Sequence, residues 1–465
     1  MGLSLNVKKC ELISSTGVTP NHPIFTDFIQ VAPNQANLLG APLLEGPAMD
    51  GALTTRCDDL RRATDRLCRI SAHDALIILR SSLSAPKILH TLRSAPCWNN
   101  PALDIFDSLL KSALCKITNN TLSEQSWIQA SLPIRDGGLG IRSVVSLAPS
   151  AFLALAASSR GLQNLILRSS MVPEDPSLDD ALTMWKSGHN TTPPSGDHCF
   201  SQKKWDRARV TMNRAQLLSS QGDNLNKARL LAVSAPHSSD WLHALSITSC
   251  GLRLDDESIR IAVGLRLGVN LCEPHICPCG GPVDATGTHG LSCIRSKGKM
   301  PRHQQINDLV WRAMTRANIP AIKEPAGLLR SDGKRPDGLT QIPWQAGKCL
   351  TWDVTIADTL ATSYLTSTSL TAGSAAERAA TKKIAKYTDL ARTHIFCPLA
   401  FESLGPMNEL GQSFISELGR RIAATTGDTR EGSFLFQRIS IAIQRCNAIS
   451  FTGTFIQPSF SSGDA

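Results

Sequence analysis

The chain has 465 residues, enough for two or three domains that each bury a core, and its 42% hydrophobic and 19% charged residues are ordinary globular values. The net charge is +9, with the basic excess in residues 201–400, and only 5% of residues are aromatic, so contact with an anionic partner would depend on charge more than on stacking. The absence of a run of about eighteen apolar residues, and of a basic-then-apolar N-terminal signal, argues against a membrane-spanning or secreted protein and predicts an intracellular one with mostly reduced cysteines.

Residues 1–168 combine short extended segments with helices. The extended segments are GLSLNVKKCELI, from Gly2, and LLGAPL, from Leu38. Helical patterns follow at 58–78, 103–117 and 143–157, the last after a Gly-rich turn at 129–142. Asp58-Asp59 precedes several arginines, which is typical of a helix start, and the Gly-rich turn lacks the Lys-Ser/Thr of a phosphate loop. Neither feature predicts a functional site.

Residues 169–270 are predicted to be a linker followed by a basic helical region. The stretch 169–200 is rich in Pro, Ser and Asp, which is typical of a linker. The stretch 201–248 has a helical pattern, with several lysines and arginines near Trp205. This pattern fits either a face that follows phosphates or a solvated helix, and the sequence alone leaves both open.

Residues 271–300 hold a cluster of cysteines and histidines with metal-ligand spacing. Cys277 and Cys279 are followed, after nine residues from Gly280 to Thr288, by His289 and Cys293. Three thiols and one imidazole can complete a tetrahedral Zn²⁺ site, and the glycines permit the tight backbone that a Cys-x-Cys pair requires. Cys272 and His275 compete with them as ligands.

A basic run leads from this cluster into the next segment. It comprises Arg295, Lys297, Lys299 and Arg302. Its position predicts contact with nucleic-acid phosphates.

Residues 301–456 predict a domain with the element order α-β-β-β-α-β and two further helices. The predicted elements are a helix at 303–317, strands at 321–328, 335–342 and 349–357, a helix at 375–393, a strand at 394–401, and helices at 408–425 and 431–450. A stripe of Leu410, Phe414, Leu418 and Ile422 predicts that the last helices cover the sheet. Residues 457–465 are predicted to be a flexible tail.

Two carboxylates in this domain predict a divalent-cation site. Asp337 opens the second strand and Asp353 lies inside the third, so neighbouring strands could bring both to one rim, where hard oxygen ligands suit Mg²⁺. Lys383 and Lys386 share one face of the following helix and could supply an ammonium, and Glu324 could be a third carboxylate. The alternative is that Asp337 serves the Arg-Pro-Asp-Gly turn and that the lysines are solvated.

The order of elements and these residues resemble the PD-(D/E)xK nuclease superfamily, and within it the restriction-like endonuclease of non-LTR retrotransposons. Pro336-Asp337 matches the PD element and Asp353 the second acid. The family's lysine, two residues after the second acid, is Thr355 here. The resemblance therefore implies that Lys383 or Lys386, in the segment KKIAKY, takes over that role.

The other segments resemble parts of the same retrotransposon proteins. Residues 1–168 are similar to the end of the palm and the thumb of their reverse transcriptase, and 271–300 to the CCHC motif that precedes their endonuclease. The family's Tyr/Phe-x-Asp-Asp hairpin lies upstream of the GLSLNVKKC segment, so no polymerase activity is expected. The resemblance implies DNA and the element's RNA as partners, a nuclear location, no membrane, and Arg335 as a further nucleic-acid contact. It leaves the oligomeric state undetermined.

Three hypotheses follow from the sequence. The first is a Mg²⁺-dependent DNA endonuclease left from a retrotransposon protein. The second is a binding protein that combines a zinc knuckle with an inactive nuclease fold. The third is a fragment without a selected function.

Overall fold

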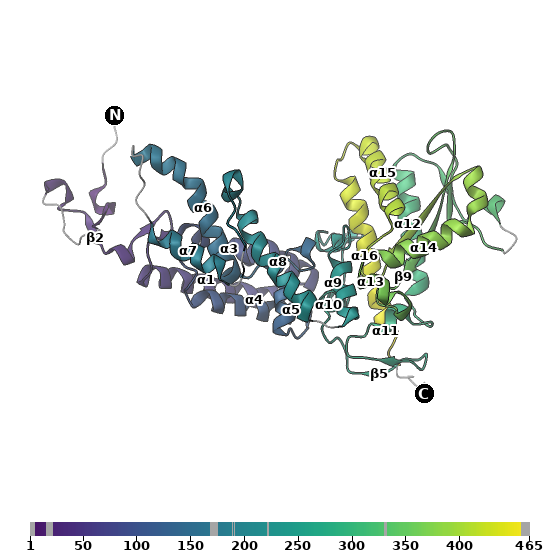
Figure 1. Ribbon diagram of the computed structural model, residues 1–465, viewed down its shortest axis with the longest axis horizontal. Coiled ribbons are helices and arrows are strands. Elements are labelled where there is room, and N and C mark those ends of the chain that lie inside the picture. Colours follow the sequence, from purple (N-terminus) through teal and green to yellow (C-terminus); the bar gives the residue numbers. More distant parts are fainter. Residues whose placement is uncertain are drawn as a thin grey trace, which may run out of the picture. The chain divides into compact units, whose positions relative to one another are not determined.

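The computed structural model describes residues 5–14, 22–167, 175–187, 189, 191–220, 223–329 and 333–456, so the predicted tail lies outside the described residues. Within them the protein is mixed α/β, with many helices and small sheets (Figure 1). Unit 1 comprises Met1–Arg69, Ile78–Leu114 and Ile141–Asn213, and unit 2 comprises Ile70–Ile77, Cys115–Gly140 and Arg214–Ala465. This division does not follow the predicted boundary at residue 168, because segments from both sides of it contribute to each unit.

Unit 1 is mainly helical. Its α-helices are α1 (Pro47–Leu67), α3 (Ala85–Ser94), α4 (Ala102–Thr118), α6 (Val144–Leu167), α7 (Pro176–Lys186) and α8 (Gln202–Ser220), and α4 and α8 continue into unit 2. β1 (Glu11–Ile13) pairs in parallel with β2 (Ile29–Val31), and β3 (Asn37–Leu38) pairs antiparallel with β4 (Ala41–Pro42). Buried residues recur every three or four positions along α1, as expected for an amphipathic helix.

Two predictions for unit 1 need correction. Helix α1 begins at Pro47, not at residue 58, and Asp58 and Asp59 lie inside it, where each pairs with an arginine three residues later. Helix α7 lies within the segment predicted to be a linker. Its Trp185 packs edge-on against Trp205 at 5.1 Å between ring centroids, and both rings are buried. Trp205 is therefore part of the core and not of a surface that follows phosphates.

Helix α6 contains the one stretch among the described residues, Val144–Ile166, that is long and apolar enough to cross a membrane. Half of its most apolar window, 50%, is buried inside the protein. Because a core helix passes the same test of length and composition, this stretch is weak evidence for a membrane span.

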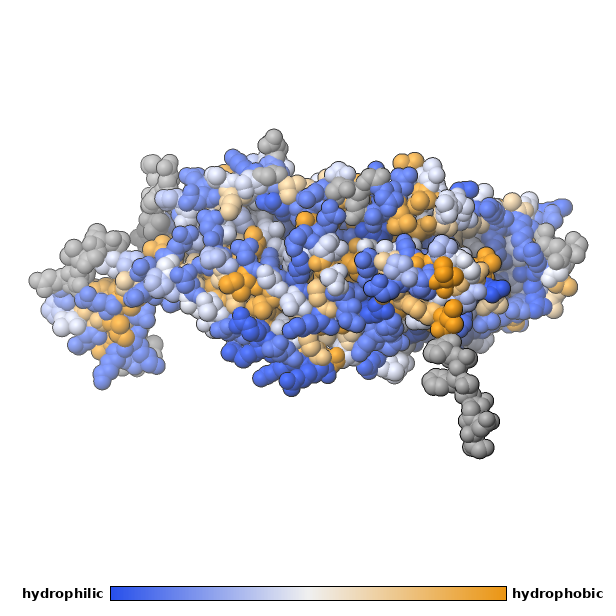
Figure 2. Space-filling model, turned by 90° about the horizontal axis from the view of Figure 1, so that it is seen from below, coloured by the Kyte–Doolittle hydropathy of each residue, from blue (hydrophilic) through white to orange (hydrophobic). Residues whose placement is uncertain are grey.

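On the face shown in Figure 2, hydrophilic residues surround several smaller groups of hydrophobic ones.

Unit 2 contains the sheet that was predicted for 301–456. Its helices are α2 (Ala72–Ile78), α5 (Glu124–Ser131), α9 (Asn224–Val233), α10 (Asp256–Leu267), α11 (His289–Ser292), α12 (Lys299–Arg316), α13 (Thr362–Thr368), α14 (Ser374–Lys386), α15 (Glu409–Thr426) and α16 (Glu431–Thr452). Its strands are β5 (His275–Ile276), β6 (Pro282–Val283), β7 (Ala321–Lys323), β8 (Gly338–Thr340), β9 (Leu350–Ala357) and β10 (Ile395–Glu402).

The four-stranded sheet has the order β10-β9-β8-β7. β10 runs parallel to β9, whereas β8 is antiparallel to both of its neighbours. Helices α12, α15 and α16 bury one face of the sheet in a core that includes Trp352, Val354 and Leu399. Because side chains alternate along a strand, Asp353 belongs to the other face, where alanines of α14 pack against Ala357 and Ala400. Of the predicted stripe on α15, Phe414, Leu418 and Ile422 are buried, but Leu410 is exposed.

Candidate functional site

The Cys/His cluster forms a compact group of metal-ligand atoms. The ligand atoms of Cys277, Cys279, His289 and Cys293 all lie within 4.8 Å of one another. The Sγ atoms of Cys277 and Cys293 are 3.7 Å apart, and the Cys279 Sγ is 3.2 Å from the His289 Nε2. A tetrahedral Zn²⁺ with Zn–S bonds of about 2.3 Å would hold two sulfurs about 3.8 Å apart. The four residues could therefore bind a metal such as zinc.

The local backbone brings these ligands together. The antiparallel β5–β6 pair holds the Cys-x-Cys turn, in which Gly280 has a φ of +88°. A Cβ at Gly281 would approach the His289 Cε1 to 2.7 Å, so this position requires glycine. The backbone N–H groups of Gly281 and Arg295 donate to the sulfurs of Cys279 and Cys293, each at 3.4 Å. The Gly281 hydrogen bond, together with weaker ones from the other three ligands, lowers the pKa of the Cys279 thiol to about 6, which favours the thiolate form that binds metals.

The two competing ligands are engaged elsewhere. The Cys272 thiol is 3.4 Å from the carbonyl oxygen of Asp284. The His275 ring is 3.0 Å from the Thr454 hydroxyl through its Nε2, and it stacks on Phe455 at 4.4 Å between centroids. The structure thus selects one ligand set from the alternatives that the sequence left open.

The second candidate site is a cluster of charged side chains beside β8 and β9, the two inner strands of the four-stranded sheet. The β8–β9 register pairs Gly338 with Trp352, and the Asp337 N–H donates to the Trp352 carbonyl at 2.9 Å, so the chain brings Asp337 next to Asp353. The Oδ2 of Asp337 accepts a 2.6 Å hydrogen bond from the Val354 N–H. Asp353 is only 3% exposed. The two predicted carboxylates are therefore neighbours on adjacent strands.

Of the two predicted lysines, Lys383 belongs to this cluster. Its ammonium forms an ion pair with the Asp353 Oδ1. Lys386 instead donates to the Tyr387 hydroxyl at 2.9 Å, and that hydroxyl donates to the Arg335 carbonyl, also at 2.9 Å. Lys386 is therefore linked to the segment before Asp337 only through the Tyr387 hydroxyl, whereas Lys383 contacts the Asp353 carboxylate directly.

His303 is a member of the cluster that the sequence analysis missed. Its Nε2 is 3.0 Å from the Asp337 Oδ2, and this hydrogen bond raises the pKa of the imidazole against the opposing effect of burial. The residue was visible in the sequence as the first residue of the helix predicted at 303–317. Its partner is 34 positions away, so no local pattern indicated the contact.

A cavity of about 410 Å³ lies beside these residues. His303 and Lys383, the side chains that contact the two aspartates, both line it, together with Lys299 and Thr355. Thr355 carries no charge. Lys383 is therefore the ammonium nearest to Asp353 in the described contacts.

Three other predicted residues have different surroundings. Glu324 lies beside Asp337, because its backbone N–H donates to the Asp337 carbonyl at 3.0 Å, but its carboxylate pairs with the exposed Arg335. The described contacts join the Glu324 carboxylate to neither aspartate, and Arg335 carries a partner of opposite charge. Arg302 is 2% exposed and donates to the Ser450 hydroxyl at 3.1 Å. Burial prevents Arg302 from serving as the surface phosphate contact that was predicted.

The rest of the basic run is exposed. Arg295 donates to the Pro278 carbonyl at 2.9 Å and so joins the run to the Cys/His cluster, whereas Lys297 and Lys299 have no acidic partner in the described part of the chain. These three side chains remain available for an anionic partner.

No protein-family model matches the chain, and no curated protein matches it.

Proposed function

We propose that the protein is a Mg²⁺-dependent DNA endonuclease derived from a non-LTR retrotransposon protein, and that the cluster of Asp337, Asp353, Lys383 and His303 is its active site. The observation that carries the proposal is the ion pair between Lys383 and Asp353, next to Asp337. An ammonium and two carboxylates on neighbouring strands are the groups that phosphodiester hydrolysis by a PD-(D/E)xK nuclease requires. The order α12-β7-β8-β9-α13-α14-β10, in which the short helix α13 is an addition to the expected order, supports assignment to that fold.

The carboxylates are suitable ligands for Mg²⁺. Each aspartate has a second carboxylate oxygen besides the one that accepts a contact described above, and hard oxygen donors suit this ion. When bound, Mg²⁺ would neutralise charge on the phosphodiester and lower the pKa of an attacking water. The Val354 N–H and His303 hold Asp337 in place, and Lys383 would stabilise the negative charge that develops on the phosphate.

The Cys/His cluster supports the same proposal. We propose that it binds Zn²⁺ and holds the basic run beside the cavity, since Arg295 is hydrogen-bonded to the Pro278 carbonyl in the cluster and Lys299 lines the cavity. DNA would be held by these cations through its phosphates.

The test is nicking of supercoiled plasmid by the full chain with Mg²⁺. Asp353→Asn keeps the size of the side chain and removes a carboxylate, so nicking should fall by about a hundredfold or more. Asp389→Asn is the matched control, because it makes the same change at an exposed acid outside the cluster and should leave nicking unchanged. Equal nicking by wild type and Asp353→Asn would refute the enzyme. If wild type binds DNA but does not nick it, the protein is a binding module with an inactive nuclease fold, as Thr355 would suggest.

A further inference from the structure

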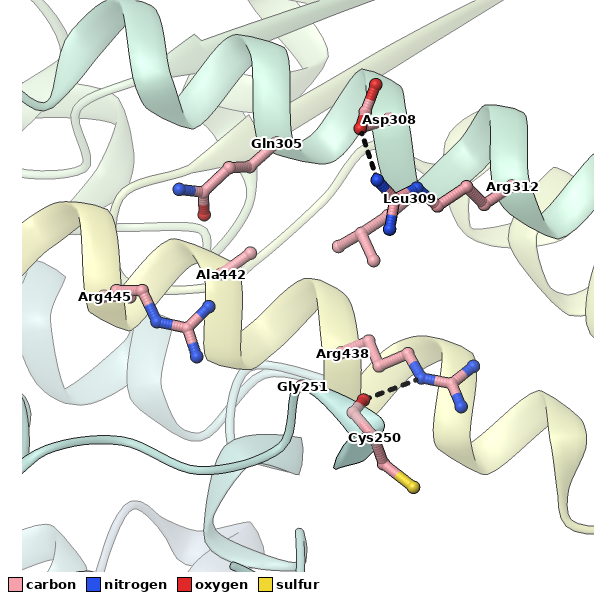
Figure 3. A pocket seen from close by; sticks show the side chains of 9 residues that line it. All are labelled: Cys250, Gly251, Gln305, Asp308, Leu309, Arg312, Arg438, Ala442 and Arg445. Atoms are coloured by element: carbon pink, nitrogen blue, oxygen red, sulfur yellow. Dashed lines mark hydrogen bonds and ion pairs between the residues drawn. The ribbon is translucent and has the colours of Figure 1, made fainter. Parts of the chain in front are cut away.

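A second cavity of unit 2 is lined by arginines from two helices. It has a volume of about 210 Å³ and lies between α12, which contributes Arg312, and α16, which contributes Arg438 and Arg445 (Figure 3). Leu309 and Ala442 form its apolar floor. We call this cavity the arginine groove. We infer that it binds the sugar–phosphate backbone of a nucleic-acid strand and is a second contact surface, separate from the cavity beside Lys383.

The charges of the groove are not balanced inside the protein. Arg438 donates to the Cys250 carbonyl at 3.3 Å, and Arg445 donates to the Arg253 carbonyl at 2.8 Å, but neither has a carboxylate partner among the described residues. The single acid among the described lining residues, Asp308, pairs with Arg312 at 3.2 Å and also with Lys323. Neutral carbonyls leave the charge of both α16 arginines uncompensated, so an anion in the groove would be attracted.

The spacing of the two arginines fits a chain of phosphates. Arg438 and Arg445 are seven positions apart, so they lie on the same side of α16 and are separated by about 10 Å along its axis. Successive phosphates of one DNA strand rise by about 3.4 Å, so the pair spans about three nucleotides. A guanidinium can bind a phosphate through two parallel N–H groups. The apolar floor suits the less polar faces of the sugars or bases.

The groove lies on the far side of α12 from the proposed active site. With about 100° per residue, Gln305, Asp308 and Arg312 are on the side of the helix opposite to His303. A strand in the groove therefore does not enter the cavity that Lys383 lines. The inference concerns binding only and does not depend on cleavage at the aspartates.

The test measures binding of a fluorescent single-stranded DNA oligonucleotide to the full chain in buffer without Mg²⁺, where Mg²⁺-dependent cleavage is absent and the proposed Zn²⁺ is not chelated. The variant is Arg438→Gln with Arg445→Gln, in which Gln can still donate to the two carbonyls. Arg420→Gln with Arg430→Gln is the matched control, since these arginines belong to the same unit, are exposed, and have acidic partners. The groove variant should bind about tenfold more weakly and lose about 1.4 from the slope of log affinity against log salt, while the control should lose about twofold at most.

Each other outcome has a defined meaning. Equal losses in the two double variants would show an effect of net charge and overturn the inference. So would displacement of the oligonucleotide by inorganic phosphate at constant ionic strength, which would indicate a site for a single anion, or by poly-glutamate, which would indicate an acidic peptide. If the groove variant does not fold, Asp308→Asn should instead tighten binding by about twofold or more, because it removes the acid at the groove. Unchanged or weaker binding by Asp308→Asn would then overturn the inference.

Discussion

Lys383 shows how the face of a helix determines the position of a single side chain. The buried positions of α14 are Ala375, Ala376, Ala379 and Ala380, which pack on the sheet. Lys383 follows Ala379 and Ala380 at four and three positions and so continues that stripe toward Asp353, whereas Lys382 is exposed. The two adjacent lysines thus form a matched pair, one at the cluster and one in solvent.

The first prediction uses this pair. Lys383→Ala should lower the rate of Mg²⁺-dependent nicking by about two orders of magnitude or more, the usual cost of one electrostatic stabiliser. Lys382→Ala removes the same charge from the same helix and should leave the rate nearly unchanged. DNA affinity, measured without Mg²⁺, should be similar for both. Equal rates for the two variants would assign Lys383 to a structural ion pair only.

Asp107, on α4 in unit 1, is a buried carboxylate that contacts the first residues of α6. It accepts hydrogen bonds from the Ser143 hydroxyl at 2.6 Å and from the Val144 N–H at 2.8 Å. Burial nevertheless raises its pKa to about 6, and the hydrogen bonds from Ser143 and Val144 oppose this shift. Since the pKa is higher in the folded protein than in the unfolded chain, the folded state binds the proton more tightly.

The second prediction is the pH dependence that results. The stabilisation from protonated Asp107 is fully present below about pH 4 and is lost as the pH rises through about 6, by up to about 3 kcal/mol. Asp107→Asn keeps the shape and removes the titration. Hydrogen–deuterium exchange of α6 peptides should accelerate with pH beyond the intrinsic chemical rate in wild type and not in Asp107→Asn. The same excess acceleration in both proteins would rule out Asp107 as its cause.

At the scale of elements, the sequence correctly predicted the helices and strands whose own residues show a helical or β-strand pattern. The apolar repeat of 303–317 corresponds to α12, and the β-branched run of 349–357 corresponds to β9, which is buried over most of its length. The strands predicted at 321–328 and 335–342 are only three residues long in the structure. β7 ends before Glu324 because that residue adopts a φ of +47° and turns the chain. The length of β8 is set by its pairing with β9. Such limits depend on neighbouring strands and leave no local signal.

The Gly-rich turn at 129–142 is structural, as the sequence suggested. The buried Arg266 donates to the carbonyls of Gly138 and Ile134 at 2.9 Å. A Cβ at Gly138 would lie 2.0 Å from the Leu132 carbonyl oxygen. The carbonyls of Ile134 and Gly138 therefore accept hydrogen bonds within the protein, and close packing explains the glycine at position 138. The distant Arg266 could not be predicted from the turn itself.

The third prediction concerns the Cys/His cluster as an element. Purified protein should contain about one Zn²⁺ per chain, because three thiols and one imidazole form a closed structural site. Cys279→Ser with Cys293→Ser should lose this zinc, whereas Cys272→Ser, which removes a nearby thiol outside the cluster, should retain it. Metal content measured by mass spectrometry shows whether each variant has lost or retained its zinc. Zinc retained by the double variant would refute the ligand set.

At the scale of the whole molecule, the candidate sites all lie in unit 2. The Cys/His cluster, the cavity beside Lys383 and the arginine groove belong to residues 214–465, and the net charge of the chain is +9. Unit 1 also carries exposed arginines, of which Arg61 and Arg62 of α1 pair with Asp58 and Asp59 in the same helix. Because Lys297 and Lys299 of unit 2 have no such partner in the described contacts, their surface should attract an anion more strongly than that part of α1 does.

The last prediction tests this distinction with duplex DNA. Replacing Arg295, Lys297 and Lys299 by Ala removes three cations, of which the two lysines have no acidic partner in the described residues, so affinity at low salt should fall by about tenfold to a hundredfold. The slope of log affinity against log salt should decrease by about two to three. Replacing Arg56, Arg61 and Arg62 of α1 removes the same charge from side chains that already pair with aspartates, and should change the affinity by about threefold at most. Zinc content must be unchanged in the first variant, since Arg295 also donates a hydrogen bond to the Pro278 carbonyl in the Cys/His cluster. Similar losses in both triple variants would mean that DNA responds to net charge and not to this surface.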